Sequence, residues 1–252
     1  MSTAAAMAPR AGAALSRVRV DHGLALEREL VAAVSAGPAA GAVRIWRPAD
    51  RTVVVPSRFA RRPGFAQVCA VLARHGYPVV LRESGGDIVP QLAGVLNVAV
   101  AFAIPRRRFG VEAAYGVLCG PLVRWLRGQG LDAGVGAVPG SFCDGRFNVT
   151  VAGRKLAGTA QRWCSAGLDT PVALAHAVVL VNVDLAELAG VCNAFYGAAG
   201  ISRACVAGNH TTLDGALLRA GYPLLGVQSI AQRLLERYHE RFATLDSEAA
   251  AE

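Results

Sequence analysis

The chain has 252 residues, a length that allows one large domain with a full hydrophobic core. Hydrophobic residues make up 53% of it, but its two richest apolar runs, 95–104 and 172–183, are too short to cross a membrane and contain polar residues. Its formal net charge of +8 favours acidic partners. The dense basic cluster at 106–108 has a single aromatic neighbour, so we do not expect a groove for nucleic acid.

We expect three parts: a disordered leader over residues 1–19, one folded domain over 20–243 and a frayed tail over 244–252. The leader is rich in alanine, and its first charged residue, Arg10, comes too late for the cationic start of a secretion signal. The tail is rich in alanine and glutamate. Secretion is therefore not expected.

The chain holds six cysteines that lie far apart in the sequence. They are Cys69, Cys119, Cys143, Cys164, Cys192 and Cys205. Without a C-x-x-C pair, this spacing argues against a structural zinc site and against a disulfide framework. We expect reduced thiols in a cytoplasmic protein, most of them buried as small hydrophobic residues.

The first half of the chain alternates between predicted helices and strands. Apolar residues at helical spacing predict a helix over 24–34, which stops at Gly37-Pro38. A second helix begins at Pro63 and stops at Gly76. Short runs rich in β-branched residues predict strands at 43–46, 52–55 and 78–82.

A glycine-containing loop at 84–86 follows the third of these strands. One long apolar strand is then expected, ending near Ile104. The next element is a helix over about 111–127, which we expect to be bent or broken at Pro121.

The middle of the chain predicts a β-hairpin. Phe147, Val149 and Val151 alternate with polar or small residues, which is the pattern of a half-buried strand. Ala152-Gly153 then makes the turn into a partner strand that carries Lys155.

A third strand over 172–183 and a helix over 185–195 follow the hairpin. Two late helices have start signals at capping-box spacing, Thr211 with Asp214 and Ser229 with Gln232. Strands and helices mix without a regular alternation. We therefore expect a single α+β domain around a mixed, largely antiparallel sheet.

Lys155 is the sole lysine among 26 lysine and arginine residues. A buried ammonium is a compact charge whose pKa shifts readily, whereas a guanidinium is a wide fork that stays charged, so chemistry can require lysine where a surface cation would not. The alternative is compositional, because a chain rich in arginine can keep one lysine without a role.

Arg82-Glu83-Ser84-Gly85-Gly86 leaves a strand into a pair of glycines. Such a loop lets backbone N–H groups approach a ligand oxygen closely. Two adjacent glycines after a strand are also common in ordinary turns, which is the alternative here.

Cys143 lies in a loop rich in proline and glycine, residues 139–145, twelve residues before Lys155. The other five cysteines lie in or beside apolar segments, where burial makes a thiol inert. If the hairpin brings the Lys155 ammonium near the Cys143 sulfur, the thiolate needed for acyl transfer is favoured. His176 is an alternative base or, within its apolar strand, a core residue.

Four sequence blocks occur in an order that is typical of one enzyme family. They are Arg82-x-Ser84-Gly85-Gly86-x-x-Val89, Gly94-x-Leu96-Asn97, Gly153-Arg154-Lys155-Leu156-Ala157-Gly158-Thr159-Ala160-Gln161, and His176 with Leu180-Val181-Asn182-Val183-Asp184. With them, the sequence resembles the catalytic domain shared by biotin and lipoate protein ligases and octanoyltransferases, over about residues 21–243.

Within that family the sequence is most similar to octanoyltransferases that move octanoyl groups between lipoyl-accepting proteins. That group has a single arginine before Ser-Gly-Gly, here Arg82, and an aromatic-Cys-x-Gly loop, here 142–145. ATP-dependent lipoate ligases usually show paired arginines, three glycines and an accessory C-terminal domain. Here Leu81 and Asp87 replace the first arginine and the third glycine, and the chain after Arg241 is short.

Two features depart from the family pattern. Pro90-Gln91-Leu92 differs from both subgroups, and Ala177 follows His176 where the family usually has glycine. In the octanoyltransferases that depend on acyl carrier protein, a cysteine farther along the chain is the nucleophile. Cys192 and Cys205 are therefore alternatives to Cys143.

The resemblance implies a class II biotin/lipoate ligase-like fold and transfer of an octanoyl or lipoyl group, through a cysteine thioester, onto a lysine of a lipoyl domain. It implies Cys143 as the nucleophile and Lys155 as the cation that holds the acyl carbonyl or oxyanion and keeps the thiol ionised. The implied substrate-binding residues are Arg82, Ser84, Gly85, Gly86, Asn97, Gly158, Thr159 and His176.

The implied partners are lipoyl-domain proteins such as glycine cleavage H protein and dehydrogenase acyltransferase subunits, with acyl carrier protein as another donor. We expect no cofactor, no metal site, no nucleic acid and no membrane partner. Two other functions stay open. One is an ATP-dependent lipoate ligase, which would use ATP and Mg and for which Cys143 is incidental. The other is a non-catalytic acyl-binding homologue.

Overall fold

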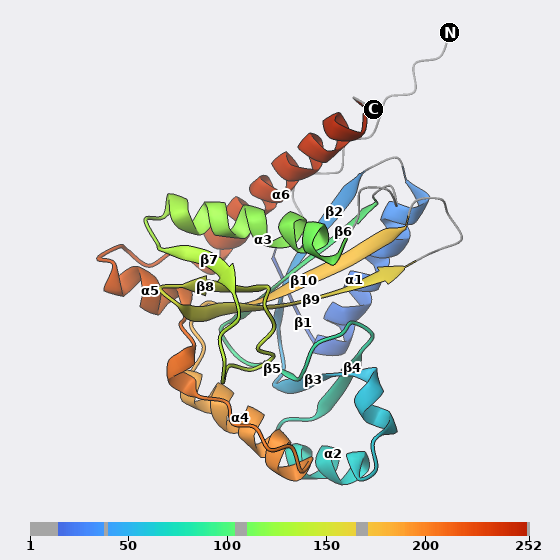
Figure 1. Ribbon diagram of the computed structural model, residues 1–252, viewed down its shortest axis with the longest axis vertical. Coiled ribbons are helices and arrows are strands. Elements are labelled where there is room, and N and C mark those ends of the chain that lie inside the picture. The colour runs from blue at the N-terminus through green and yellow to red at the C-terminus, as the bar shows by residue number, and fades with distance from the viewer. Residues whose placement is uncertain (1–14, 38–39, 104–109, 165–170, 251–252) are drawn as a thin grey trace.

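The computed structural model of the protein describes residues 15–37, 40–103, 110–164 and 171–250. Its centre is a seven-stranded sheet in the order β1-β2-β6-β10-β9-β8-β7 (Figure 1). The strands span Ser16–Val18 (β1), Gly41–Pro48 (β2), Val95–Ala103 (β6), Val172–Leu180 (β10), Arg154–Cys164 (β9), Asn148–Val151 (β8) and Ala133–Gly136 (β7). β1 pairs with β2 in parallel, and the other neighbours are antiparallel. The expected α+β class with a mixed, largely antiparallel sheet is confirmed.

A second, three-stranded sheet lies below the large one in Figure 1, in the order β4-β3-β5. It consists of Val79–Arg82 (β4), Thr52–Pro56 (β3) and Val89–Gln91 (β5), and a 3-10 turn, η1, follows at Ser57–Arg61. Two helices pack around it, Phe65–Arg74 (α2) and Leu185–Ala198 (α4), with Phe59 of η1 edge-on against Phe195 of α4. The loop between β4 and β5 carries Ser84 to Gly86.

The large sheet buries both of its faces, because its central strands alternate between two sets of apolar residues. Helix α1 (Val20–Ala36) covers one face, where Leu30 and Val34 pack against Ala99 and Leu174. On the other face, Leu96 and Val98 belong to a core shared with three helices. These are Val111–Gly128 (α3), Leu213–Arg219 (α5) and Val227–Ala250 (α6). Asn97 and His176 alternate with that second set and lie on the α1 side.

The predicted hairpin is confirmed, with Ala152 at φ 47° and Gly153 at φ 72° forming the turn between β8 and β9. The long strand expected after the glycine loop is instead two strands, β5 and β6, that belong to different sheets. The break falls at Gly94, whose φ is +86° and whose carbonyl accepts hydrogen bonds from Val181 and Asn182. Ile104, the expected end of the strand, lies outside the described residues.

Helix α3 is continuous through Pro121, so it is not broken there. Two predicted helix starts were wrong. The N-cap of α5 is Thr212, whose hydroxyl accepts from the Gly215 N–H, and not Thr211. Helix α6 begins at Val227, so Ser229 lies inside it rather than at its start.

The chain ends also differ from expectation where the structure describes them. Residues 16–18, which we assigned to the leader, form β1. Helix α6 runs to Ala250, past the point where we expected a frayed tail. Residues 1–14, 251–252 and the basic cluster at 106–108 lie outside the described part of the chain.

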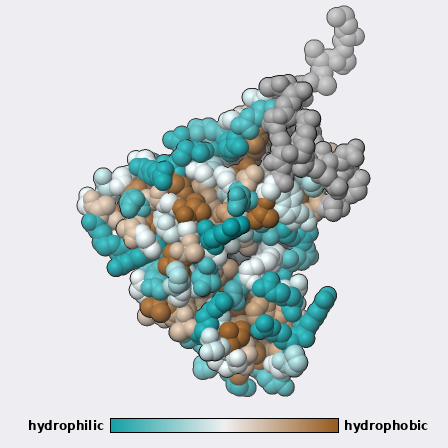
Figure 2. Space-filling model, viewed as in Figure 1, coloured by the Kyte–Doolittle hydropathy of each residue, from teal (hydrophilic) through white to brown (hydrophobic). Residues whose placement is uncertain are grey.

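Within the described ranges, no helix is both long and apolar enough to cross a bilayer. On the face drawn in Figure 2, apolar residues form small patches among hydrophilic ones.

Candidate functional site

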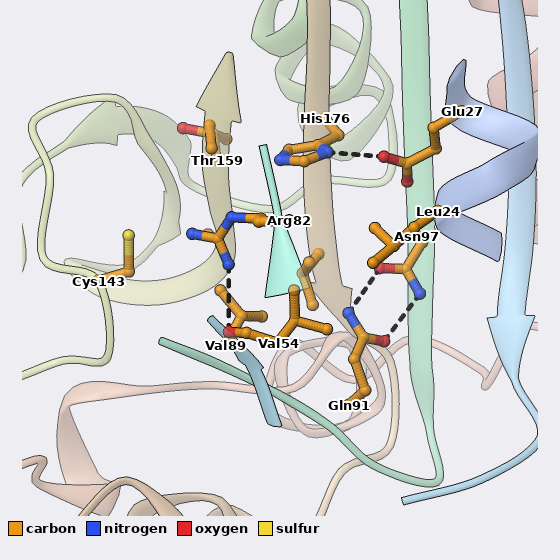
Figure 3. A pocket seen from close by; sticks show the side chains of 13 residues that line it. Leu24, Glu27, Val54, Arg82, Val89, Gln91, Asn97, Cys143, Thr159 and His176 are labelled. Atoms are coloured by element: carbon orange, nitrogen blue, oxygen red, sulfur yellow. Dashed lines mark hydrogen bonds and ion pairs between the residues drawn. The ribbon is translucent and has the colours of Figure 1, made fainter. Parts of the chain in front are cut away.

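A narrow slot lies between the large sheet, the small sheet and helix α1 (Figure 3). It holds about 380 Å³ of empty space, open solvent included. Its lining residues are Leu24, Glu27, Val54, Arg82, Val89, Gln91, Asn97, Cys143, Gly158, Thr159, Ala160, His176 and Val178. Sheet register explains the floor, because Val178 pairs with Asn97 and Gly158 on its two sides, and His176 pairs with Ala160.

Two of the polar side chains in the slot satisfy each other. Gln91 and Asn97 exchange two amide hydrogen bonds of 2.9 Å, and both residues are buried. Each amide uses one donor and one acceptor in bonding to its partner. The neighbouring part of the wall is apolar and consists of Val54, Val89 and Val178.

A second polar group links Ser84, His176 and Glu27. The Ser84 Oγ lies 3.0 Å from His176 Nε2, and His176 Nδ1 lies 2.8 Å from Glu27 Oε2. Glu27 is 3% exposed, and its other oxygen accepts from Trp46 Nε1 at 3.1 Å. His176 thus has two defined partners and faces the slot.

Arg82 is a buried cation at the centre of Figure 3. Its guanidinium donates to the carbonyls of Val54, Gly85 and Asp87 at 3.3, 2.8 and 2.6 Å. Its Nε is buried and has no hydrogen-bond partner. Burial lowers the pKa of Arg82, and the negative charges near it oppose that shift. The wall of the slot therefore contains a fixed positive charge.

Cys143 lies where the slot meets a wider outer pocket. Its backbone is in the left-handed region, at φ 45°, and its Sγ accepts a hydrogen bond of 3.2 Å from the Asp87 N–H. A Cβ on Gly86 would lie 2.9 Å from this Sγ and 3.1 Å from Arg82 Nη2. Glycine at 86 therefore lets the glycine loop, the sulfur and the guanidinium come together.

The expectation that Cys143 is the accessible cysteine among buried ones was wrong. Cys143 is only 7% exposed, whereas Cys69 and Cys164 are half-buried. Burial comes from Phe142 and the small sheet, which belong to the same core cluster. Cys143 differs from the other five cysteines in lining both the slot and the outer pocket.

Lys155 is fully buried and holds the Cys143 loop by its backbone. Its Nζ donates to the carbonyls of Phe142 and Cys143, the latter at 2.9 Å, and lies 3.8 Å above the centre of the Phe142 ring. Burial lowers the pKa of Lys155 to about 8, although the nearby Cys143 raises it. Lys155 does not belong to the slot lining, so it acts on the loop from behind.

His210 supports the same loop from the other side. Its Nε2 accepts a hydrogen bond of 3.2 Å from the Phe142 N–H, its Nδ1 lies 3.0 Å from the Val206 carbonyl, and its ring stacks on Phe142. The Thr211 N–H in turn donates to the Lys155 carbonyl.

Cys192 and Cys205, the alternative nucleophiles, form a buried pair of their own. A hydrogen bond from Cys192 lowers the pKa of Cys205 to about 5, with further help from His210 and Lys155. Burial raises the pKa of Cys192. Neither residue lines the slot or the two pockets next to it, so a bound acyl group in the slot would meet Cys143 first.

The outer pocket is larger than the slot, with about 760 Å³ of empty space, open solvent included. Its charged lining residues are three arginines and two aspartates, Arg58, Arg62, Arg203, Asp87 and Asp144. Arg203 pairs with Asp87 at 2.6 Å, and Arg58 donates to the Gly86 carbonyl. The arginines therefore also hold the glycine loop beside Cys143.

The structure brings most of the predicted site residues together. Those that line the slot are Arg82, Asn97, Cys143, Gly158, Thr159 and His176. Gly86 lines the outer pocket, and Ser84 lines a third pocket that adjoins the slot. Gly85 contributes its carbonyl to Arg82. Among the described residues, no group of three or more His, Cys, Asp or Glu side chains is placed to hold a metal ion.

Sequence reasoning missed Glu27, Gln91, Asp87 and His210. Two of these left a signal, since Glu27 falls in the apolar stripe of its helix and Gln91 lies within an apolar strand. A charged or amide side chain at such a position indicates a buried polar partner. Asp87 and His210 contact the Cys143 loop from positions far away in the chain, which no local pattern indicates.

Known proteins are similar to this chain in sequence and in fold. Residues 20–208 match the family of the lipoyl protein ligase A/B catalytic domain. An uncharacterized protein of Cupriavidus necator is 37% identical over 71% of this chain and 75% of its own length. An octanoyl-GcvH:protein N-octanoyltransferase of Kyrpidia tusciae is 42% identical over 48% of this chain. The matched segment spans 43% of that transferase.

A solved structure confirms the fold. The crystal structure of lipoate-protein ligase A bound with ATP superposes with a TM-score of 0.67, covering 91% of this chain and 85% of that one, at 17% identity. A likeness at that identity concerns the arrangement of the elements and not the activity.

Proposed function

Because this chain belongs to the family of lipoyl protein ligase A/B catalytic domains, we propose that it is a protein octanoyltransferase that works through a Cys143 thioester. The observation that carries the proposal is the position of Cys143. Cys143 lines the slot on one side and the outer pocket on the other. An acyl chain in the slot would present its carbonyl at the sulfur, with the donor or acceptor protein outside.

The slot suits a medium-length acyl chain. Leu24, Val54, Val89 and Val178 supply apolar wall, and Gln91 and Asn97 are paired with each other. Burial is worth about 0.8 kcal/mol per CH₂, so most of an octanoyl chain contributes several kcal/mol to binding. This matters because such a chain offers no polar group along its length.

Two polar groups lie next to the sulfur. The Asp87 N–H donates to Sγ, and the guanidinium of Arg82, at the end of β4, lies close by. In the proposed reaction, the Cys143 sulfur bonds to the donor carbonyl carbon, and the thiol proton goes to the donor lysine nitrogen as the C–N bond breaks. The acceptor lysine amine then attacks the thioester, the C–S bond breaks, and the proton lost by that amine restores the Cys143 thiol.

The geometry changes the roles we expected for two cations. Arg82 lines the slot and its guanidinium lies near the Cys143 sulfur, so we assign to it the stabilisation of the carbonyl oxygen. Lys155 contacts the carbonyls of Phe142 and Cys143, so we assign to it the positioning of the loop. In this scheme Lys155 is a positioning residue.

The charge of the chain favours an acidic partner. Arg58 and Arg62 lie at the approach to Cys143, where Arg203 is paired with Asp87, and the chain has a formal net charge of +8. We propose lipoyl-domain proteins, among them glycine cleavage H protein, as donor and acceptor, with charge complementarity guiding their encounter.

The test is a transfer reaction with purified full-length protein. Octanoylated glycine cleavage H protein and an unmodified lipoyl domain are mixed with the protein, with and without ATP and Mg, and both substrates are followed by intact mass. We expect the octanoyl mass to move to the lipoyl domain without nucleotide. Transfer that requires ATP and free octanoate or lipoate would select the ligase function, and binding without any transfer would select the non-catalytic one.

A further inference from the structure

Ser84, His176 and Glu27 lie in the order that serine hydrolases use for nucleophile, base and acid. The Ser84 Oγ is 3.0 Å from His176 Nε2, and His176 Nδ1 is 2.8 Å from Glu27 Oε2. The three residues come from the β4–β5 loop, from β10 and from α1. We infer that they form a second nucleophilic site, which hydrolyses medium-chain acyl esters and thioesters independently of Cys143.

The hydrogen-bond partners fix the tautomer of His176. A carboxylate accepts only, so in the neutral imidazole Nδ1 carries the proton and donates to Glu27, and Nε2 accepts from the Ser84 hydroxyl. Trp46 Nε1 donates to the second Glu27 oxygen and keeps the carboxylate in place. The base is therefore oriented toward Ser84 before any substrate binds.

A pocket gives the Ser84 residue access to substrate. Ser84, His176 and Glu27 line a pocket that adjoins the slot, with Leu24 and Arg82 common to both spaces. Arg28 and Glu83, at the rim of this pocket, are exposed. An acyl chain can therefore occupy the slot while its ester group lies at Ser84.

Arg82 supplies the stabilising donor for the oxyanion. Its Nε is buried without a partner, and Arg82 lines the pocket of Ser84 as well as the slot. A fixed cationic donor near a developing negative charge is the main requirement for this kind of acyl transfer. The pocket thus holds nucleophile, base, acid and oxyanion donor.

The proposed reaction needs only the ester and water. The Ser84 oxygen bonds to the acyl carbon while its proton passes to His176 Nε2, and the bond to the alcohol or thiol leaving group breaks as that group takes the proton. Water then gives a proton to His176, its oxygen attacks the acyl-serine, and Ser84 recovers its proton as the fatty acid leaves. This activity is distinct from transfer, because it does not involve Cys143.

The first experiment measures p-nitrophenyl octanoate hydrolysis in the full-length Cys143→Ala protein, which separates it from the proposed transferase. We expect steady turnover in Cys143→Ala and a loss of roughly 100-fold or more on adding Ser84→Ala. Adding Ser229→Ala instead, at an exposed position of α6, should change nothing. No turnover in Cys143→Ala, or equal turnover with and without Ser84, would overturn the inference.

A second variant separates catalysis from folding. His176→Gln keeps an amide that can bond to Glu27 and Ser84 but cannot take up a proton. In the Cys143→Ala background we expect it to abolish hydrolysis while the melting temperature stays within a few degrees. Undiminished hydrolysis in this folded variant would show that His176 is not the base.

A covalent label identifies the nucleophile directly. Trypsin cuts after Arg82 and Arg106, and Ser84 is the sole hydroxyl-bearing residue of the peptide 83–106, which also lacks cysteine and lysine. A fluorophosphonate probe should add its mass to this peptide in Cys143→Ala but not in Cys143→Ala with His176→Gln. A label that maps elsewhere, or none at all, would contradict the assignment.

Discussion

The Lys155 ammonium donates a hydrogen bond of 2.9 Å to the carbonyl oxygen of Cys143, which ties the charge to the backbone of the loop that carries the sulfur. Cys143 has φ 45°, a conformation that a residue with a side chain adopts only when its surroundings hold it there. Lys155, behind the loop, and the Asp87 N–H, at the sulfur, provide that support.

Lys155→Arg should lose transfer although it keeps the positive charge. The ammonium is fully buried between the Phe142 ring and Gly158, where a Cβ would already lie 3.2 Å from Lys155 Cε, so a wider guanidinium has no space. We expect octanoyl transfer, read by intact mass, to fall roughly 100-fold or more. Arg154→Lys at the exposed neighbouring position is the control, and normal transfer by Lys155→Arg would make the lysine a compositional remnant.

Lys155 should also give the protein a distinctive stability at alkaline pH. Its pKa falls from 10.5 to about 8 on burial, so between these values the unfolded chain binds a proton that the folded protein lacks. Stability therefore rises with pH over this interval, by an amount on the order of 3 kcal/mol when complete. Urea unfolding of wild type and Lys155→Met from pH 7 to 10.5 should show the wild type gaining stability relative to the variant. Parallel curves would mean that Lys155 titrates normally.

Gly86→Ala should damage the site more than the fold. Gly86 has φ +94°, and a Cβ there would meet Cys143 Sγ and Arg82 Nη2 at 2.9 and 3.1 Å. Gly85→Ala is the matched comparison, because a Cβ at 85 meets nothing within 4 Å. We expect transfer by Gly86→Ala to be at least roughly tenfold lower than by Gly85→Ala, with both proteins folded by circular dichroism. Equal transfer by the two variants would show that the contact of Gly86 with Cys143 does not matter for the reaction.

The interaction between the buried amides of Gln91 and Asn97 can be measured by a double-mutant cycle. Asn97→Leu leaves Gln91 without its partner in the slot wall, which should cost about 1–3 kcal/mol beyond the change in packing. Adding Gln91→Leu removes the orphaned amide, so the double variant should be more stable than the sum of the single losses implies. Urea unfolding of the four proteins measures the coupling. Additive losses would show that the two amides do not depend on each other.

Local patterns predicted the parts of the fold that local chemistry decides. Alternating residues and the Ala152-Gly153 turn gave the hairpin, and the apolar run at 172–183 gave β10. The division of residues 89–103 into β5 and β6 could not be read in the same way. It depends on Gly94 packing against Asn182, which is 88 positions away in the chain and adjacent only in the fold.

The site was predictable in its residues but less so in their roles. The recognisable blocks named Lys155, Arg82 and His176, and the loop pattern at 142–145 named Cys143. The structure gathers these residues around one slot and its loop. Their partners follow from strand register and from the docking of α1, which a single sequence does not fix. Glu27, for example, reaches His176 only because α1 packs across β10.

Cys143, among six cysteines, should be the residue that carries the acyl group. It lines the slot and the outer pocket, its Sγ accepts a hydrogen bond from the Asp87 N–H, and the Arg82 charge lies beside it. Cys205 has the lowered pKa, but it is buried beside Cys192 and faces neither pocket. Nucleophilic attack requires contact with the acyl carbonyl as well as a thiolate, so position decides between the two.

Protein treated with an octanoylated donor should gain one octanoyl mass that hydroxylamine removes. Trypsin cuts after Arg127 and Arg146, and Cys143 is the sole cysteine of the peptide 128–146, so the label can be placed by peptide mass. Cys143→Ala should neither gain the adduct nor transfer octanoyl, while Cys69→Ala and Cys119→Ala should do both. Label on the peptide of Cys164, Cys192 or Cys205, or full transfer by Cys143→Ala, would move the nucleophile elsewhere while leaving the family unchanged.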